Sequence, residues 1–307
     1  MTSVSTNQPQ AASVLVPIAV CAIAILVLTG MDASMKGLVL VIGVYNAIFW
    51  RSILSSAVAG SVWLARRSPI PTRRVLMLHA LRAAVIGLTV MCFFWGLARI
   101  PIAEAIALSF IAPLLALLMA AVMLGERIRP AAIWASVAGL AGVAVIMAGN
   151  LGRGDYSQDA LLGALSALAS TGFYAYNLIL ARQQALVAKP LEVTFFQNFC
   201  LAVLLAFASP WLAYAVPREM WPLLCLVSAL SMIGQFLMSW AYRRAEAQYL
   251  IPTEYTAFVW AVLLGWYFFG EVIGWTTIAG AALIIAGCLY AAMVKPKLAE
   301  PIEAAGV

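Results

Sequence analysis

Apolar residues form ten long stretches along the chain, and short polar segments separate each stretch from the next. A membrane-spanning helix needs about 20 predominantly apolar residues, because each residue advances the helix by ~1.5 Å through a hydrocarbon core of about 30 Å. All ten stretches meet this length. We therefore predict an all-α polytopic membrane protein with ten transmembrane helices at 14–35, 41–65, 75–98, 101–124, 130–148, 160–182, 191–216, 220–242, 248–269 and 275–294.

The two halves of this pattern are related to each other. Placing each residue beside the one 145 positions later aligns Trp95 with Trp240 and Gly125-Glu126 with Gly270-Glu271. Each half holds five helices, an odd number, so the second copy enters the membrane from the opposite side. This is an inverted repeat, an architecture in which transporters bind substrate between the halves near the midplane. Both Gly-Glu pairs are predicted helix stops, since glycine accommodates the C-cap geometry.

The repeat sets the predicted domain organisation. The polar start is expected to be disordered, and the first apolar run is read as a retained membrane helix because no Lys or Arg precedes it and no convincing cleavage site follows. The predicted segments are a disordered N-terminus at 1–13, a first repeat at 14–148, a linker at 149–159, a second repeat at 160–294 and a cytoplasmic tail at 295–307.

Composition and charge agree with a lipid environment. Only 10% of the residues are charged, against about 25% in soluble domains, so the lipid bilayer must cover most of the surface. Twelve Lys and Arg residues fall in one set of alternate loops and four in the other, which predicts that both termini face the cytoplasm. These cations are scattered, so we expect no nucleic-acid partner despite the net charge of +6.

The residues that common catalytic sites require are scarce in this chain. One histidine in the whole chain leaves almost no material for a zinc-protease motif, a di-histidine metal site or a Ser-His triad. No glycine-rich phosphate loop is present either. We therefore expect no bound metal, no cofactor and no enzymatic activity.

The segment from Phe94 to Ala105, followed by Gly125-Glu126-Arg127, resembles the EamA-like members of the drug/metabolite transporter superfamily. The segments Met31 to Lys36 and Phe49 to Ser52 resemble the same family. The resemblance implies ten helices in two EamA-type repeats and secondary transport of organic metabolites. The family includes amino-acid and metabolite exporters, nucleotide-sugar carriers and importers of vitamins such as riboflavin, so it does not name the substrate.

Arg51 is the candidate binding residue with the clearest chemical reason. It lies ten residues into the second predicted helix, about 15 Å from the boundary, and its permanent charge requires a carboxylate, phosphate or carbonyl partner. That partner is either an anionic substrate or a carboxylate on another helix. Trp50 can stack on a planar ligand or anchor at the interface, and we place Asn46 in the same predicted site.

Further polar and aromatic positions line the other predicted helices. Arg82, with His79 three residues earlier, forms a stripe that either faces the transport pathway or reaches the cytoplasmic interface. The remaining candidates serve either substrate binding or helix packing, and they are Phe93, Tyr174, Asn177, Gln197, Gln235 and Tyr255.

Three carboxylates are candidates for proton coupling, because a carboxylate in an apolar cavity can alternate between charged and neutral forms. They are Asp32, Glu104 and Glu254. Asp32 has an alternative role in a local ion pair with Lys36, one helical turn away. Glu104 and Glu254 have an alternative role at helix N-termini, where negative charge is favourable.

These observations predict a secondary active transporter that moves a small organic metabolite across a bacterial inner membrane by alternating access. Export of an amino acid or related metabolite is the main expectation, and import of a riboflavin-like vitamin is the alternative within the family. An intramembrane enzyme or a non-transporting assembly protein is the alternative of another class. Assembly as a homodimer stays open.

Overall fold

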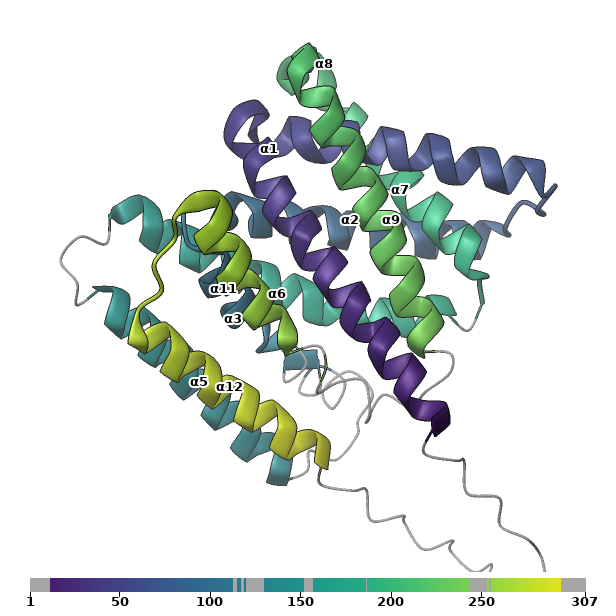
Figure 1. Ribbon diagram of the computed structural model, residues 1–307. Helices are drawn as coiled ribbons and strands as arrows, with labels where there is room; N and C mark the ends of the chain where they lie inside the picture. Colours follow the sequence, from purple (N-terminus) through teal and green to yellow (C-terminus); the bar gives the residue numbers. More distant parts are fainter. Residues whose placement is uncertain are drawn as a thin grey trace, which may run out of the picture.

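The computed structural model describes residues 12–112, 115–116, 119, 130–151, 157–185, 187–242, 253 and 255–293. All regular secondary structure in these residues is helical, which confirms the predicted all-α class (Figure 1). The elements are α1 (Ala12–Ala65), α2 (Arg73–Leu97), α3 (Ile102–Ser109), α5 (Pro130–Leu151), α6 (Gln158–Ala185), α7 (Pro190–Ala206), α8 (Ser209–Leu212), the 3-10 helix η1 (Arg218–Met220), α9 (Trp221–Tyr242), α11 (Thr256–Phe269) and α12 (Trp275–Met293).

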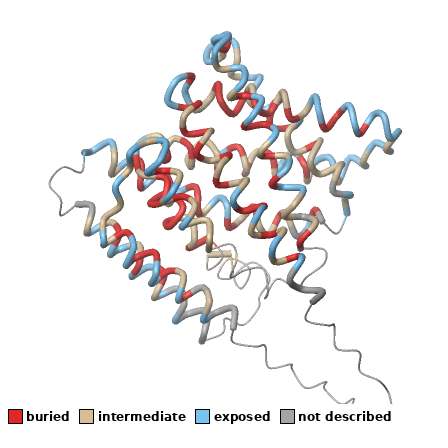
Figure 2. Tube along the Cα trace, in the orientation of Figure 1, coloured by how far each residue is buried: buried red, intermediate tan, exposed pale blue. Residues whose placement is uncertain are grey.

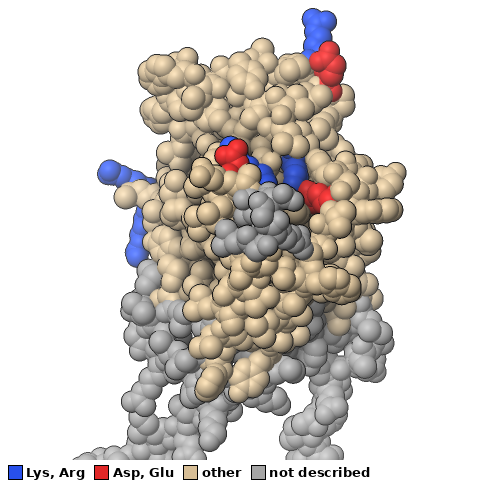
Figure 3. All heavy atoms as spheres, turned by 90° about the vertical axis from the view of Figure 1, so that its left-hand side faces the viewer, with Lys and Arg blue, Asp and Glu red and all other residues tan. Residues whose placement is uncertain are grey.

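Four of the described helical segments are long and apolar enough to cross a membrane: Val16–Ala65, Arg73–Leu97, Gln158–Ala181 and Arg218–Met238. Four shorter apolar helices accompany them, at Val137–Gly149, Leu191–Ala206, Thr256–Phe269 and Trp275–Gly287. Figure 3 shows that residues other than Lys, Arg, Asp and Glu make up most of the described surface on the face that it presents. The count of ten helices and the cytoplasmic position of both termini stay predictions.

The first two predicted helices meet at Gly43. The sequence suggested a connection at 36–40, which is wrong, because α1 runs through this region and changes direction at Gly43 (φ 71°, ψ 161°). This backbone conformation is essentially restricted to glycine. Lys36 suggested a polar loop, yet its side chain is only 8% exposed within the helix. A long-range partner, described below, makes that burial tolerable.

Two other boundaries differ from the prediction. Helix α7 ends at Ala206 rather than at 216, and α8 and η1 follow it in a region that contains Pro210 and Pro217. Proline lacks an amide hydrogen and clashes with the preceding helical turn, which explains the early end. Helix α3 ends at Ser109, four residues before Pro113, which itself lies outside the described residues.

Helices from the two halves of the chain pack against each other. Helix α1 lies along α9, α2 along α6, and α5 along α12 (Figure 1). The contacts of α2 and α5 depend on glycine, since a Cβ atom on Gly96 would lie 2.5 Å from the Gly163 carbonyl oxygen and one on Gly142 would lie 2.6 Å from that of Gly280. Three pairs of helices, each with one member from either half, therefore pack closely together.

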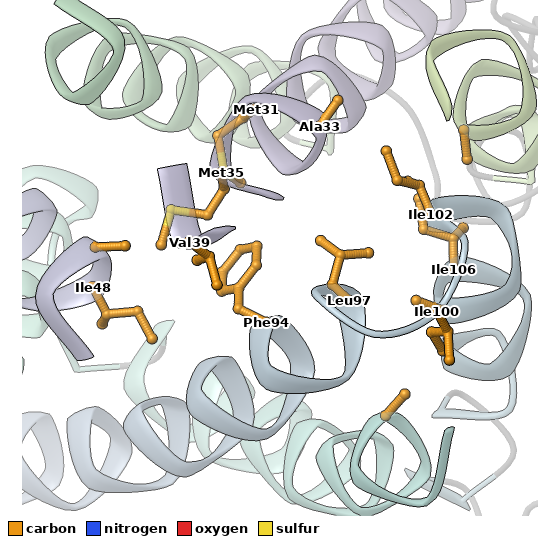
Figure 4. Close-up of a cluster of buried hydrophobic side chains, with 14 of the residues drawn as sticks. Met31, Ala33, Met35, Val39, Ile48, Phe94, Leu97, Ile100, Ile102 and Ile106 are labelled. Atoms are coloured by element: carbon orange, nitrogen blue, oxygen red, sulfur yellow. The ribbon is translucent and has the colours of Figure 1, made fainter. Parts of the chain in front are cut away.

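The buried core lies where α1, α2 and α3 meet. Met31, Met35 and Val39 of α1 are close to Phe94 and Leu97 of α2 (Figure 4). The third element contributes Ile102 and Ile106 of α3. Figure 2 shows buried positions concentrated on the inward faces of the helices, with exposed positions on the outward faces. The core thus fixes the first half of α1 beside the polar residues described next.

Candidate functional site

Arg51 and Asp32 lie on the two segments of α1 that meet at Gly43. Arg51 is eight residues beyond Gly43, about 12 Å along the helix, and is 8% exposed. Its Nη1 lies 3.8 Å from the Sδ of Met31, and its Nε has no hydrogen-bond partner among the described residues. The half-buried Asp32 interacts electrostatically with Arg51, without a direct ion pair. A buried arginine therefore retains donors that a ligand can use.

Asn46 and Trp50 bind the connection between α7 and α9. Asn46 donates from Nδ2 to the Leu212 carbonyl (3.2 Å) and accepts from the Tyr214 amide (3.1 Å). Trp50 donates from Nε1 to the Tyr214 carbonyl (3.1 Å) and contacts Trp221 edge-on. Tyr214 in turn donates from its hydroxyl to the Ile42 carbonyl (2.6 Å). Both predicted site residues thus hold a loop against the bend in α1.

Arg82 joins Asn177 in a second polar group between α2 and α6. It donates from Nε to Asn177 Oδ1 (3.0 Å) and from Nη1 to Oε1 of Gln184. Tyr174 interacts with it electrostatically. These donors bind side chains of α6, and the position of Arg82 on the transport pathway or at the interface stays a prediction. The structure brings three of the predicted site residues together here.

This second group extends to His79 and Glu192. The His79 ring is fully buried, stacks on Phe196 at 5.3 Å, and accepts at Nδ1 from Nε2 of Gln184. Its Nε2 lies 3.3 Å from Glu192 Oε1 at the start of α7. We name the set Asn177, Arg82, Gln184, His79 and Glu192 the polar chain. It connects one helix of the first half to two of the second.

The remaining predicted site residues lie apart from these groups. Phe93 packs against the buried core and contacts Phe94, while Tyr255 makes an edge contact with Phe110 at 5.1 Å. Gln235 is exposed and donates only within α9, to Ser231. Gln197 is half-buried on α7. The ten candidate positions are therefore spread over several regions and do not form one described pocket.

The three candidate coupling carboxylates also have different surroundings. Asp32 is half-buried beside Arg51, and Glu104 is buried in the first turn of α3. Glu254 lies outside the described residues. The proposed local pair of Asp32 with Lys36 is wrong, because Lys36 Nζ lies 2.6 Å from Glu271 Oε1. Gly270 confirms the predicted helix stop, with φ 63° at the end of α11.

Sequence reasoning missed three residues of these groups. Gln184 lies beyond the predicted end of its helix at 182, and Glu271 was interpreted only as part of a helix stop. Glu192 occupies the first turn of α7, where acidic residues are common for electrostatic reasons alone. Only the structure shows that α6 continues to Ala185 and so places Gln184 inside the bundle.

Two apolar grooves lie between the second segment of α1 and α7. One, of about 280 Å³, is lined by Phe49, Ile53, Ser56, Phe199 and neighbouring residues of α7. The other, of about 390 Å³, continues from Ser56 and Phe199 toward Leu64 and Phe195. Arg51 and the polar chain line neither groove. Within the described part of the chain, no group of three His, Cys, Asp or Glu side chains could hold a metal ion.

Comparison with known proteins identifies the family. The model of the EamA-like transporter family matches residues 15–148 and again residues 161–293. The chain belongs to the EamA-like transporter family. As a member, it is a membrane protein of a transporter family, in agreement with the resemblance of its sequence and with its apolar helices.

Curated relatives in this family are transporters of different compounds. The pseudopaline exporter CntI of Pseudomonas aeruginosa is 28% identical over 86% of this chain and 92% of its own length. The riboflavin transporter of Rhizobium johnstonii is 31% identical over 69% of this chain and 68% of its own. The aromatic amino acid exporter YddG of Ancylobacter novellus is 28% identical over 66% of this chain and 71% of its own.

A solved crystal structure shares the fold. It superposes with a TM-score of 0.60, covering 91% of this chain and 99% of the other, at 21% sequence identity. At that identity the likeness concerns the fold alone. The family is therefore established by sequence, and the arrangement of the helices also occurs in an experimentally determined structure.

Proposed function

We propose that this EamA-family protein is a secondary active transporter that moves a small organic metabolite across a bacterial inner membrane by alternating access. Substrate binds between two inverted repeats, whose termini face the cytoplasm. The observation that carries the proposal is Arg51, which is 8% exposed on a long apolar helix and has an Nε without a partner among the described residues. A permanently charged group at such a place is expensive and usually functional.

The surroundings of Arg51 favour a substrate with both a carboxylate and an ammonium group. Arg51 provides donors for a carboxylate, and Asp32 lies near enough to interact with it while remaining free of a direct ion pair. A zwitterion would bring an opposite charge to each of these groups. Relatives named as pseudopaline and aromatic amino acid exporters support export of an amino-acid-like metabolite.

A vitamin such as riboflavin is the second candidate substrate. Its support is the similarity to riboflavin transporters, together with the Phe110–Tyr255 contact, where aromatic rings could receive a flat ligand. Riboflavin has no carboxylate and no ammonium group. An amino-acid-like substrate should require Arg51 for binding and riboflavin should not, so a substitution of Arg51 distinguishes the two candidates.

The first test is thermal unfolding of the purified protein in detergent with amino acids, carboxylic acids and riboflavin. A ligand at 100 times its Kd stabilises the native state by about 2.7 kcal/mol, which raises the melting temperature. We expect an amino-acid-like ligand to do so for the wild type and for Arg99→Gln, whose arginine is exposed over Trp95. Arg51→Gln should lose the response. A riboflavin response that survives Arg51→Gln would favour the second candidate.

Flux measurements then test transport itself. Liposomes containing the wild-type protein should exchange the ligand found above, whereas liposomes with Arg51→Gln at equal protein density should not. Binding without flux would contradict the proposal of a transporter. Normal flux through folded Arg51→Gln would remove Arg51 from the binding site.

A further inference from the structure

The single histidine of the chain occupies the polar chain, at the junction of three helices. His79 of α2 is fully buried between Gln184 of α6 and Glu192 of α7. Its ring also stacks on Phe196, which contacts Trp63 near the end of α1. A titratable group that contacts both halves of the protein can make their packing depend on whether it carries a proton.

The hydrogen bonds of the polar chain determine the tautomer of this histidine. Arg82 can only donate, so the amide of Gln184 must present its oxygen to Arg82 and its NH₂ to His79. His79 Nδ1 is then an acceptor and carries no hydrogen. The hydrogen is on Nε2, which donates to Glu192 Oε1 over 3.3 Å. The ring is neutral in this arrangement.

We propose that His79 and Glu192 form a proton-binding site, and that filling it loosens α2 from α6 and thereby couples the packing of the two halves to proton movement. A proton taken from water adds to the lone pair of His79 Nδ1. The hydrogen bond from Gln184 Nε2 to that atom then breaks, because two donors face each other, and no covalent bond is broken. The imidazolium keeps Glu192 as its counter-ion through Nε2–H.

The charges in and around the proposed site add up to zero before His79 binds a proton. Within the described residues, the charged group in direct contact with His79 is Glu192 of α7. Arg82 of α2 is linked to it through Gln184, and Tyr174 of α6 interacts with Arg82. From α1 the nearby aromatic side chain is the uncharged Trp63. Neutral His79, ionised Glu192 and ionised Arg82 sum to no net charge, and one added proton gives +1. Glu192, with 16% of its side chain exposed, connects the site with the surface.

Proton loading changes more than one contact. Gln184 is the only link in the polar chain between His79 and Arg82, so its rotation also withdraws the acceptor of Arg82 Nη1. Arg82 then keeps Asn177 as its acceptor on α6. The consequence for transport rests on the proposed function. The proton site itself does not depend on the proposed function, and its test needs no substrate.

The first measurement is nuclear magnetic resonance of the full-length protein in liposomes, with histidine labelled by ¹⁵N. One histidine gives one pair of ring-nitrogen signals. At alkaline pH we expect Nε2 protonated and Nδ1 bare, and on acidification Nδ1 gains a proton in one step. The opposite tautomer, or an Nδ1 that stays bare from pH 8 to pH 4.5, would overturn the proposal.

The second measurement asks whether the proton moves the helices. Spin labels replace the exposed Arg74 of α2 and Gln183 of α6 in a cysteine-free background, and their distance is followed over the same pH range. We expect a longer distance at acid pH, lost in His79→Gln and weakened in Glu192→Gln, whereas Glu219→Gln on η1 behaves as the parent. A distance that stays constant while His79 titrates would make it a structural histidine only.

The outcome is separable from that of the Arg51 experiments. Loss of ligand binding in Arg51→Gln leaves the proton site untouched, and a silent His79 leaves the substrate proposal standing. If His79→Gln fails to fold, the Glu192→Gln variant still decides the question, because it preserves the size and hydrogen-bonding capacity of the side chain.

Discussion

Lys36 Nζ lies 2.6 Å from Glu271 Oε1 and so joins two residues that are 235 positions apart. The same ammonium donates to the Ile100 carbonyl (2.6 Å), and Glu271 Oε2 accepts from the Ile102 amide (2.8 Å). One ion pair therefore holds together α1, the turn between α2 and α3, and the segment that follows α11. Among the described residues, it is the ion pair with the shorter N–O distance of the two that join the halves of the chain.

Removing one member of this pair should be costly. Lys36→Met leaves the Glu271 carboxylate half-buried with one hydrogen-bond donor instead of two, and breaking a buried pair costs about 3–5 kcal/mol. We expect the melting temperature in detergent to fall clearly. The double variant Lys36→Met/Glu271→Leu should recover part of the loss, because no charge then remains unpaired. A double variant less stable than both single variants would contradict this account.

Asn46 should matter for the loop between α7 and α9. Asn46→Leu removes the hydrogen bonds that Asn46 makes to the Leu212 carbonyl and from the Tyr214 amide, so this loop should open more readily. Faster hydrogen exchange at the Tyr214 amide is the expected result. Asn198→Leu is the matched control, because Asn198 donates only to Thr194 within its own helix. Equal exchange in both variants would remove Asn46 as the residue that holds the loop.

Gly96 should be intolerant of even one added carbon. A Cβ at this position would lie 2.5 Å from the Gly163 carbonyl oxygen, so Gly96→Ala must separate α2 from α6 and should cost about 1–3 kcal/mol. Gly172 of α6 has no atom within 4 Å of its Cβ position. Gly172→Ala should therefore be neutral or stabilise by about 0.5–1 kcal/mol. Thermal unfolding of the two variants side by side checks the contrast.

Gly43 should be required for its backbone and not for space. No atom lies within 4 Å of its Cβ position, yet its φ of 71° is unfavourable for alanine by about 1–3 kcal/mol. We expect Gly43→Ala to lower the melting temperature, whereas Gly30→Ala, also in open space within α1, should not. If the two variants melted alike, the bend in α1 would not depend on glycine.

Local patterns were sufficient for much of the fold. The apolar stretches predicted α2 at 75–98 and α12 at 275–294, close to the observed Arg73–Leu97 and Trp275–Met293, because the lengths of such helices follow from local hydrophobicity. The end of α11 at Gly270 was also predictable, since glycine adopts the left-handed conformation at low cost. Boundaries set by polar residues were less predictable, as Lys36 inside α1 demonstrates.

For the polar residues, too, some properties were predictable from the sequence and others were not. The membrane class, the family resemblance and the charges that need partners could be predicted from the chain alone, because they depend on residue type and on spacing within one helix. The tertiary structure alone decided which partner each charge found: Glu271 for Lys36, and Asn177 with Gln184 for Arg82. The physical reason is that a buried charge can be satisfied by any acceptor that packing brings near, and helix packing joins residues far apart in the chain.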